Sequence, residues 1–317
     1  MVTFVQLLQN QPGLAMVTNG VIGALAVITV AYWLLLWFWP TQGLPKIGSR
    51  IAFLWMVTLF FVLGILYTYK ILILYIWFIA FLALKEFFSM TPTRRADRRV
   101  LFCAYLSLPI QFIFILLEWR NAFLLFVPIH VFLVLPMVMV LIGEPRGFLR
   151  AWSTIGWSII TTVYSLGYLA YLLVLPVVAK PTVGGSGLFL FLVGLAQISH
   201  AAQFVFGKLF PDPRLSLKVS QTRNWASLLG SILVTAPVAW FVAPWLTPFT
   251  PSQATLMGVI VAAGAFVGYI ILSAIKTDLQ IKDRGTMMPG HGGILNRIDA
   301  FIYTAPLFFF LVGAWHY

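Results

Sequence analysis

Residues 254–275 read ATLMGVIVAAGAFVGYIILSAI and contain no charged side chain. The hydrocarbon core of a bilayer is roughly 30 Å thick, and about 20 consecutive apolar residues cross it as one α-helix. The stretch lacks the alternation of polar and apolar residues that a strand of a membrane β-barrel requires. Residues 254–275 therefore predict a membrane-spanning helix.

The same pattern recurs along almost the whole chain of 317 residues. Hydrophobic residues make up 61% of the chain and charged residues only 9%, which argues against a soluble domain with a polar surface. The apolar runs predict an all-α, polytopic integral membrane protein with about ten transmembrane segments. These segments are expected at 20–39, 51–68, 71–90, 100–117, 121–142, 154–178, 186–206, 225–247, 254–275 and 299–315.

The basic residues predict the orientation. With the N-terminus outside, the outer connections hold only Lys70, Arg120 and Lys180, while most other Lys and Arg residues fall in the inner connections. Because basic residues favour the cytoplasmic side, we expect this orientation in a bacterial inner membrane, with the polar loops 207–224 and 276–298 in the cytoplasm. No basic region precedes the first apolar run, so no cleaved signal peptide is expected.

The domain organisation is predicted to be simple. No low-complexity linker, convincing repeat or soluble segment separates the spans, so we expect a single membrane domain over 1–317. Residues 1–180 would supply N-terminal helices, and residues 181–317 a C-terminal region of catalytic type. The single cysteine, Cys103, excludes an internal disulfide or a cysteine-based metal cluster.

Residues 273–299 gather many of the chain's few charges. The cations Lys276, Lys282 and Arg297 suit phosphate oxygens, while the carboxylates Asp283 and Asp299 are hard ligands that hold Mg²⁺ beside substrate phosphates. The segment PGHGG, residues 289–293, lets backbone N–H groups approach an anion. Together these features suggest metal-assisted phosphoryl or nucleotidyl transfer.

Each of these residues also has a simpler interpretation. A single cation beside a membrane helix more often records orientation or contacts a lipid headgroup. Glycines before a helix are common in turns. Only the complete ordered pattern favours a phosphate site.

That ordered pattern resembles the signature of the phosphatidate cytidylyltransferases, which are also called CDP-diacylglycerol synthases. The N-terminal half shows only a general likeness to the family, such as LALKEFF at 82–88. The signature positions that match are Ser273, Lys276, Lys282, Asp283, Gly285, Pro289, Gly290, His291, Gly292, Gly293, Arg297 and Asp299.

Two positions within the signature depart from the family pattern. Thr277 stands where the family has Arg, and Asn296 stands where it has Asp. An amide offers a carbonyl oxygen to Mg²⁺ but brings no charge, so metal affinity is expected to fall.

The loop 207–224 resembles a second family motif less closely. The positions that fit are Gly207, Lys208, Lys218, Val219, Ser220 and Trp225, and Arg223 conserves the positive charge of a family Lys. Ser199 and His200 occupy the place of a family Asn-Asp pair, Gln221 replaces Pro, and Ala226 and Ser227 replace Glu-Gly. Carboxylates are therefore missing at three sites, which indicates a changed metal arrangement or changed chemistry.

The resemblance implies that a phosphate oxygen of phosphatidic acid attacks the α-phosphorus of CTP, giving CDP-diacylglycerol and pyrophosphate. It implies Mg²⁺ held by Asp283, Asp299 and Asn296, with catalytic roles for Asp283, Asp299 and His291. Membrane lipids and a second copy in a homodimer are the expected partners, and no nucleic acid is expected. The residues implied to bind substrate phosphates are Ser273, Lys276, Lys282, Gly292, Gly293, Arg297, Lys218, Ser220 and Arg223.

Two alternatives stay open. The missing carboxylates are compatible with a family member that binds lipid phosphate or regulates a partner without nucleotidyl transfer. The number of spans alone is compatible with a lipid transporter.

Overall fold

The computed structural model describes residues 12–38, 44–66, 68–91, 98–144, 146–175, 184–210, 223–279 and 293–316. Within these ranges the chain forms helices and no strand, which confirms the predicted all-α class. The elements are α2 (Pro12–Phe38), α3 (Leu44–Leu66), α4 (Tyr69–Met90), α5 (Arg98–Leu116), α6 (Arg120–Leu125), η2 (Phe126–Val131), α7 (Phe132–Leu141), α8 (Phe148–Ile159), η3 (Ile160–Tyr164), α9 (Ser165–Tyr171), η4 (Leu172–Val174), α10 (Gly184–Leu209), α11 (Trp225–Leu246), α12 (Pro251–Asp278) and α13 (Leu295–His316).

Nine helical stretches in the described part of the chain are long and apolar enough to cross a membrane. α3 is apolar over the shorter stretch Leu54–Gly64 and stands where the second of the ten segments was predicted. Because α3 ends at Leu66 and α4 begins at Tyr69, the long apolar run of the sequence is divided between two helices. The protein is therefore a polytopic helical membrane protein.

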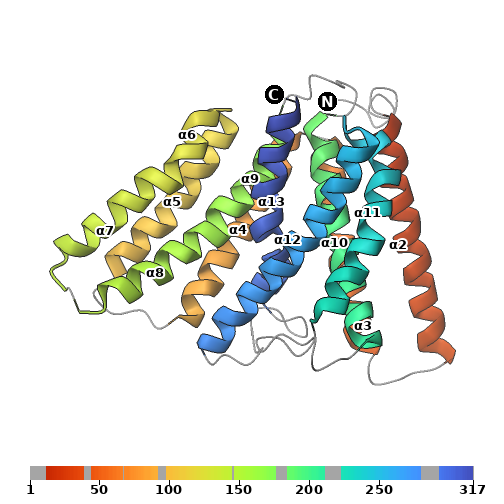
Figure 1. The fold of residues 1–317 in the computed structure, drawn as a ribbon, viewed down its shortest axis with the longest axis horizontal. Helices are drawn as coiled ribbons and strands as arrows, with labels where there is room; N and C mark the ends of the chain where they lie inside the picture. The colour runs from red at the N-terminus through yellow and green to blue at the C-terminus, as the bar shows by residue number, and fades with distance from the viewer. Residues whose placement is uncertain are drawn as a thin grey trace.

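The chain passes back and forth between the two ends of the bundle in Figure 1, with α6 and α7 continuing in one direction and α8 and α9 in another. α2 begins and α13 ends at the upper end of the bundle in that view. α10 ends, α11 begins, α12 ends and α13 begins at the lower end (Figure 1). The helix ends that border the two predicted polar loops therefore lie at the same end of the bundle.

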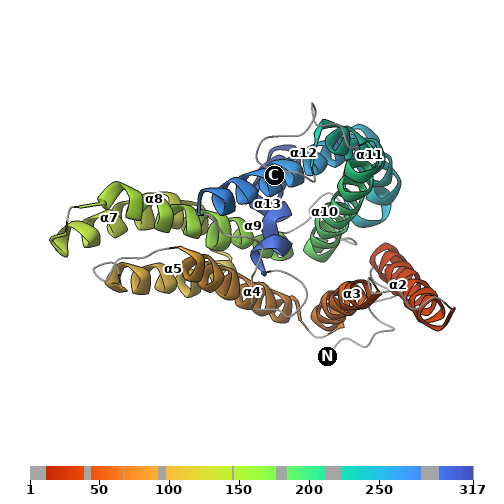
Figure 2. The same cartoon turned by 90° about the horizontal axis from the view of Figure 1, so that it is seen from below.

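α13 has a central position. It packs against α12 and α10 on one side and against α9 and α4 on the other (Figure 2). α10, α11 and α12 also pack on one another, so the last four helices form a compact group. The first turns of α13 can thus receive side chains from several helices.

Two helices extend further into the charged segment 276–298 than the sequence predicted. α12 continues to Asp278, whereas the predicted span ended at 275, and α13 begins at Leu295, whereas the predicted span began at 299. The hydropathy pattern missed these turns because charged residues fill them. Lys276, Asn296 and Arg297 are consequently held on helices and not in a loop, which corrects the predicted boundaries.

Gly268 permits a close approach between α12 and α13. A Cβ atom added at Gly268 would overlap the backbone carbonyl oxygen of Asp299. Any larger residue would push the two helices apart at the level of Asp299. The glycine at position 268 therefore lets the backbone of α13 at Asp299 lie directly against α12.

Candidate functional site

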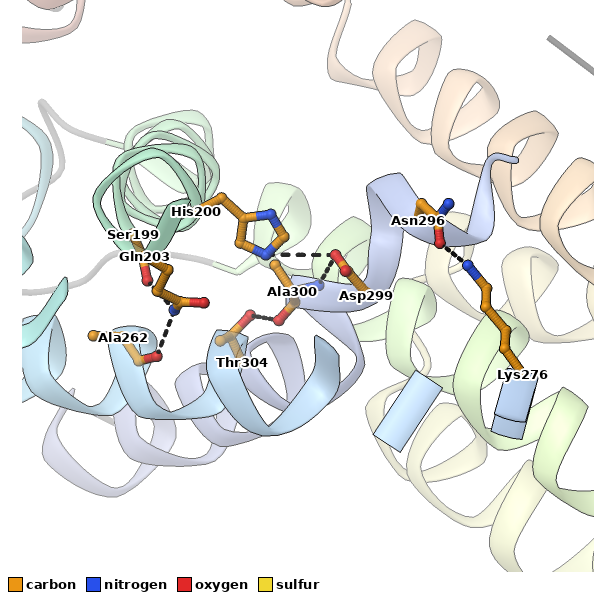
Figure 3. A network of polar contacts seen from close by, with 9 residues as sticks. All are labelled: Ser199, His200, Gln203, Ala262, Lys276, Asn296, Asp299, Ala300 and Thr304. Atoms are coloured by element: carbon orange, nitrogen blue, oxygen red, sulfur yellow. Dashed lines mark hydrogen bonds and ion pairs between the residues drawn. The ribbon is translucent and has the colours of Figure 1, made fainter. Parts of the chain in front are cut away.

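Polar side chains from four segments meet around the first turns of α13. Figure 3 shows His200 of α10 pointing toward Asp299 of α13, and Lys276 of α12 pointing toward Asn296 of α13. Arg223, which directly precedes the capping residue of α11, is also close enough to act electrostatically on Asp299. These residues, distant in sequence, form one cluster.

Asp299 is the buried centre of this cluster. Its side chain is only 3% exposed, and its Oδ1 accepts the backbone N–H of Ala300 at 2.7 Å. The same oxygen lies 3.4 Å from Nε2 of His200. A buried carboxylate is costly unless compensated, and here Arg223, Lys276 and Arg297 all act on it.

Arg223 is held in place by an aromatic ring. Its side chain is 8% exposed, and its guanidinium carbon lies 4.3 Å from the ring centroid of Tyr269 on α12. Burial lowers the pKa of the Arg223 guanidinium from its ordinary value, and the charge of Asp299 and a hydrogen bond with Tyr269 act in the opposite direction. Because an ordinary Arg titrates far above neutral pH, Arg223 remains a cation.

The segment before α11 is also well defined. Asn224 caps α11, because its Oδ1 accepts the backbone N–H of Ser227 at 2.8 Å while Oγ of Ser227 accepts that of Asn224 at 3.2 Å. Ser227, which stands where the family pattern has Gly, is thus part of the N-terminal cap of α11. The capping box fixes the direction from which Arg223 enters the cluster.

Lys276 and Asn296 connect α12 with α13. Nζ of Lys276 donates a hydrogen bond to Oδ1 of Asn296. The family pattern has Asp at position 296. The single side-chain oxygen of Asn296 therefore stands in place of two carboxylate oxygens, and it faces Lys276. Lys276 also acts electrostatically on Glu86 of α4.

Glu86 is a site residue that the sequence analysis did not single out. Its side chain is 4% exposed, and its Oε2 accepts the N–H of Ile294 at 2.5 Å and that of Leu295 at 3.4 Å. The first N–H groups of a helix lack partners within the helix, and a carboxylate there is also favoured by the helix dipole. Glu86 therefore caps α13 from a different helix. An acidic residue within a membrane span was the signal that could have revealed it.

Gly293 provides the space for this cap. A Cβ atom added at Gly293 would overlap the Glu86 carboxylate. The PGHGG segment was predicted to bring backbone N–H groups to an anion, and the structure places a carboxylate of the chain itself at the end of that segment. The N–H groups of Ile294 and Leu295 are consequently used by Glu86.

Ser199 and Gln203 contribute to packing. Both side chains are fully buried, and Nε2 of Gln203 donates to Oγ of Ser199 at 2.9 Å and to the carbonyl of Ala262 on α12 at 3.3 Å. The first bond lies within α10, and the second links α10 to α12 about one turn after His200 (Figure 3). They hold His200 at the level of Asp299.

The structure thus brings together part of the predicted site. Lys276, Asn296, Arg297, Asp299 and Arg223 lie in or around the cluster, and Ser273 lies about one turn before Lys276 on α12. Ala226 is the second residue of α11. The predicted residues Lys218, Ser220, Lys282, Asp283, His291 and Gly292 lie outside the described residues.

The described residues do not by themselves form a site for a divalent metal ion. They contain no group of three or more His, Cys, Asp or Glu side chains that could hold one. Oδ1 of Asn296 accepts from Lys276, and Oδ1 of Asp299 faces His200 and the neighbouring cations. Magnesium prefers several oxygen ligands at short distance, so the expectation of Mg²⁺ depends on Asp283, outside the described part.

An apolar cavity of about 600 Å³ borders the cluster. Its walls come from α3, α4, α9, α10 and α13, with side chains such as Phe60, Phe189 and Ile298. Arg297 belongs to the same lining. Arg297 therefore lines the apolar cavity and also acts electrostatically on Asp299 of the charged cluster.

Comparison with known proteins gives the family. A sequence profile of the cytidylyltransferase family matches residues 48–315. The chain belongs to this family. The match confirms the resemblance seen in residues 273–299 and assigns the chain to a class of nucleotidyltransferases of phospholipid biosynthesis. With its apolar helices, it is an integral membrane protein.

Individual relatives agree with this assignment. The uncharacterized protein YnbB of Escherichia coli K12 is 34% identical over 278 residues, covering 88% of this chain and 91% of YnbB. A phosphatidate cytidylyltransferase of Synechocystis is 32% identical over 140 residues, 42% of this chain and 46% of that protein. A phosphatidate cytidylyltransferase of Mycobacterium bovis is 31% identical over 132 residues, 41% of each chain. The matches to these two enzymes thus span less than half of their length.

Proposed function

We propose that the protein transfers a cytidylyl group from CTP to a lipid phosphate, with phosphatidate as the expected acceptor. The products are then CDP-diacylglycerol and pyrophosphate. Family membership supports the reaction class. The observation that supports a lipid acceptor is the position of Arg297, which lines the apolar cavity and also acts on Asp299 within the charged cluster.

The cavity and the cluster suit the two parts of such a substrate. A volume of about 600 Å³ is typical of small-molecule sites, which measure roughly 300–1,000 Å³. Burying an acyl chain in it contributes about 0.8 kcal/mol per CH₂ group. The phosphate of the same lipid would then lie at Arg297, near Lys276 and Arg223.

In the proposed reaction, an oxygen of the lipid phosphate forms a bond to the α-phosphorus of CTP. The bond from that phosphorus to the oxygen bridging toward the β-phosphorus breaks, and pyrophosphate leaves with the electron pair. A phosphate monoester is already a competent nucleophile near neutral pH, so no strong general base is needed. The contribution of this chain is positioning and compensation of charge by Lys276, Arg223 and Arg297.

The proposal also includes the cofactor, the orientation in the membrane and the oligomeric state. Mg²⁺ remains the proposed cofactor of the transfer, with Asp283 as its expected ligand and His291 as a further phosphate contact. We place the charged end of the bundle in the cytoplasm, where CTP is available, in a bacterial inner membrane. A homodimer is proposed from the family resemblance alone.

The proposal is tested by pyrophosphate release from purified protein in detergent with Mg²⁺ and CTP. Dioctanoyl phosphatidate and glycerol 3-phosphate present the same kind of phosphate monoester, but only the first has acyl chains for the cavity. We expect release with phosphatidate and little or none with glycerol 3-phosphate. Equal release with both acceptors would contradict a lipid site, and no release with phosphatidate would contradict the proposed reaction.

A second candidate function is binding of a lipid phosphate without transfer. The hydrogen bond from Lys276 to Asn296 supports it, because this position has lost the charge that the family pattern carries. Asn296→Asp separates the two candidates. An active wild type supports transfer, whereas a silent wild type and an active Asn296→Asp variant support a binding protein.

A further inference from the structure

We infer that this cluster binds phosphate oxygens directly through Lys276, Arg223 and Arg297, without a divalent metal ion. Asn296 and Asp299 then position these cations and do not act as metal ligands. The inference deepens the proposed function and rests on it for the identity of the phosphate compounds. It concerns binding, which is separate from any need for Mg²⁺ in the transfer step.

The first argument concerns the contacts of Asn296 Oδ1 and Asp299 Oδ1, two oxygens that were expected to bind Mg²⁺. Oδ1 of Asn296 accepts a hydrogen bond from Lys276. Oδ1 of Asp299 accepts the N–H of Ala300 at 2.7 Å and lies 3.4 Å from Nε2 of His200. Oδ1 of Asn296 is thus already used by a cation of the protein, and Oδ1 of Asp299 by a backbone N–H.

The second argument is the charge around Asp299. Arg223, Lys276 and Arg297 act electrostatically on this single carboxylate. Lys276 also acts electrostatically on Glu86, whose Oε2 accepts N–H groups at the start of α13. A divalent cation at Asp299 would be repelled by three positive charges, whereas a phosphate would be attracted by the same three.

The third argument comes from the residues that replace family acids. His200 and Asn296 both lie in this cluster, and each replaces a negative charge by a neutral or basic group. Each replacement weakens a cation site and strengthens an anion site. Guanidinium and ammonium groups are the side chains that most often hold phosphate oxygens, Arg in a two-bond geometry.

The test is binding measured by titration calorimetry on the purified full chain in detergent, in excess EDTA and in Mg²⁺. The probes are dioctanoyl phosphatidate and inorganic pyrophosphate, which represent the lipid headgroup and the nucleotide phosphates. At least one probe is expected to bind in EDTA with an affinity within about threefold of that in Mg²⁺. Binding that occurs only in Mg²⁺ would overturn the inference. The probe that binds in EDTA identifies the source of the phosphate.

Two variants and one control make the test specific to the cluster. Lys276→Ala is expected to weaken binding in EDTA about 10-fold, as the loss of one charge-assisted contact predicts. Arg120→Ala, a change at the opposite end of the bundle, is expected to leave binding unchanged. Equal binding by wild type and Lys276→Ala would overturn the assignment.

Asn296→Asp provides the second variant and adds a carboxylate beside Lys276. The inference predicts weaker binding in EDTA, because the new charge repels phosphate and competes for Lys276. Unchanged binding in EDTA with stronger binding in Mg²⁺ would show a metal at position 296 and overturn the inference.

Pyrophosphate release, measured on the same preparation, separates this inference from the proposed function. Release in Mg²⁺ together with binding only in Mg²⁺ leaves the proposed function intact and rejects the inference. Binding in EDTA without any release supports the inference and rejects the proposed transfer.

Discussion

The cap that Glu86 provides for α13 predicts an energetic coupling between Glu86 and Gly293. Glu86→Ala removes the carboxylate that accepts the N–H groups of Ile294 and Leu295. Gly293→Ala adds a methyl group that overlaps the same carboxylate. The backbone of Gly293 is not in the left-handed region, so the strain of an alanine there comes from the contact of its methyl group with Glu86 and not from its backbone angle.

The magnitudes follow from these contacts. Loss of a capping group costs about 1–2 kcal/mol, and the buried position and charge of Glu86 place this change near 2 kcal/mol. A methyl group forced into a packed site costs about 1–3 kcal/mol. In the double variant Glu86→Ala/Gly293→Ala the methyl group no longer meets a carboxylate. The destabilisation of the double variant should therefore be about 1–2 kcal/mol smaller than the sum of the two single changes.

Thermal unfolding in detergent can measure this coupling. The single cysteine, Cys103 in α5, is partly buried, so a thiol-reactive dye reports its exposure as the protein unfolds. Glu86→Ala is expected to lower the unfolding temperature on the order of 4 °C. Lys85→Ala, a change at the exposed neighbour of Glu86, serves as the control and should unfold like the wild type.

Additive costs in the double variant, or unfolding of Glu86→Ala at the wild-type temperature, would contradict the predicted coupling. The first result would mean that Gly293 is needed for another reason. The second would mean that Glu86 does not stabilise the start of α13.

Three further predictions concern the walls of the cluster. Gly268→Ala should destabilise the protein by about 1–3 kcal/mol in the same unfolding assay, because its methyl group overlaps the carbonyl of Asp299. Arg223→Lys should raise KM for the lipid about 10-fold in steady-state kinetics, because Lys loses the planar stack on Tyr269 and two-bond phosphate contact. His200→Asp should show a larger Mg²⁺-dependent rise in unfolding temperature than the wild type, because two carboxylates then face each other.

The spans could be predicted from the sequence because hydropathy is a local property. The division between α3 and α4, for example, follows from the length limit of a membrane helix, and in the structure α3 ends at Leu66 and α4 begins at Tyr69. The family resemblance was likewise carried by one short segment. Neither inference needs contacts between distant residues.

The start of α13 and the partners of its polar residues could not be predicted in this way. α13 begins before the apolar run because Glu86, 208 residues earlier than Ile294, accepts the first N–H groups. The stacking of Arg223 on Tyr269 and the hydrogen bond from Lys276 to Asn296 also join separate helices. Such contacts depend on how helices pack, which the spacing of residues in one sequence does not show.

We propose that Arg297 joins the apolar cavity to the site of cytidylyl transfer. The most direct measurement is incorporation of label from α-³²P-labelled CTP into organic-extractable lipid, with Mg²⁺ and phosphatidate. We predict label in the lipid with the wild type and with Arg120→Ala, and a loss of about 100-fold with Arg297→Ala, since such positioning contacts are worth factors of this size. Absence of label with the wild type, or equal incorporation by Arg297→Ala, would contradict the account.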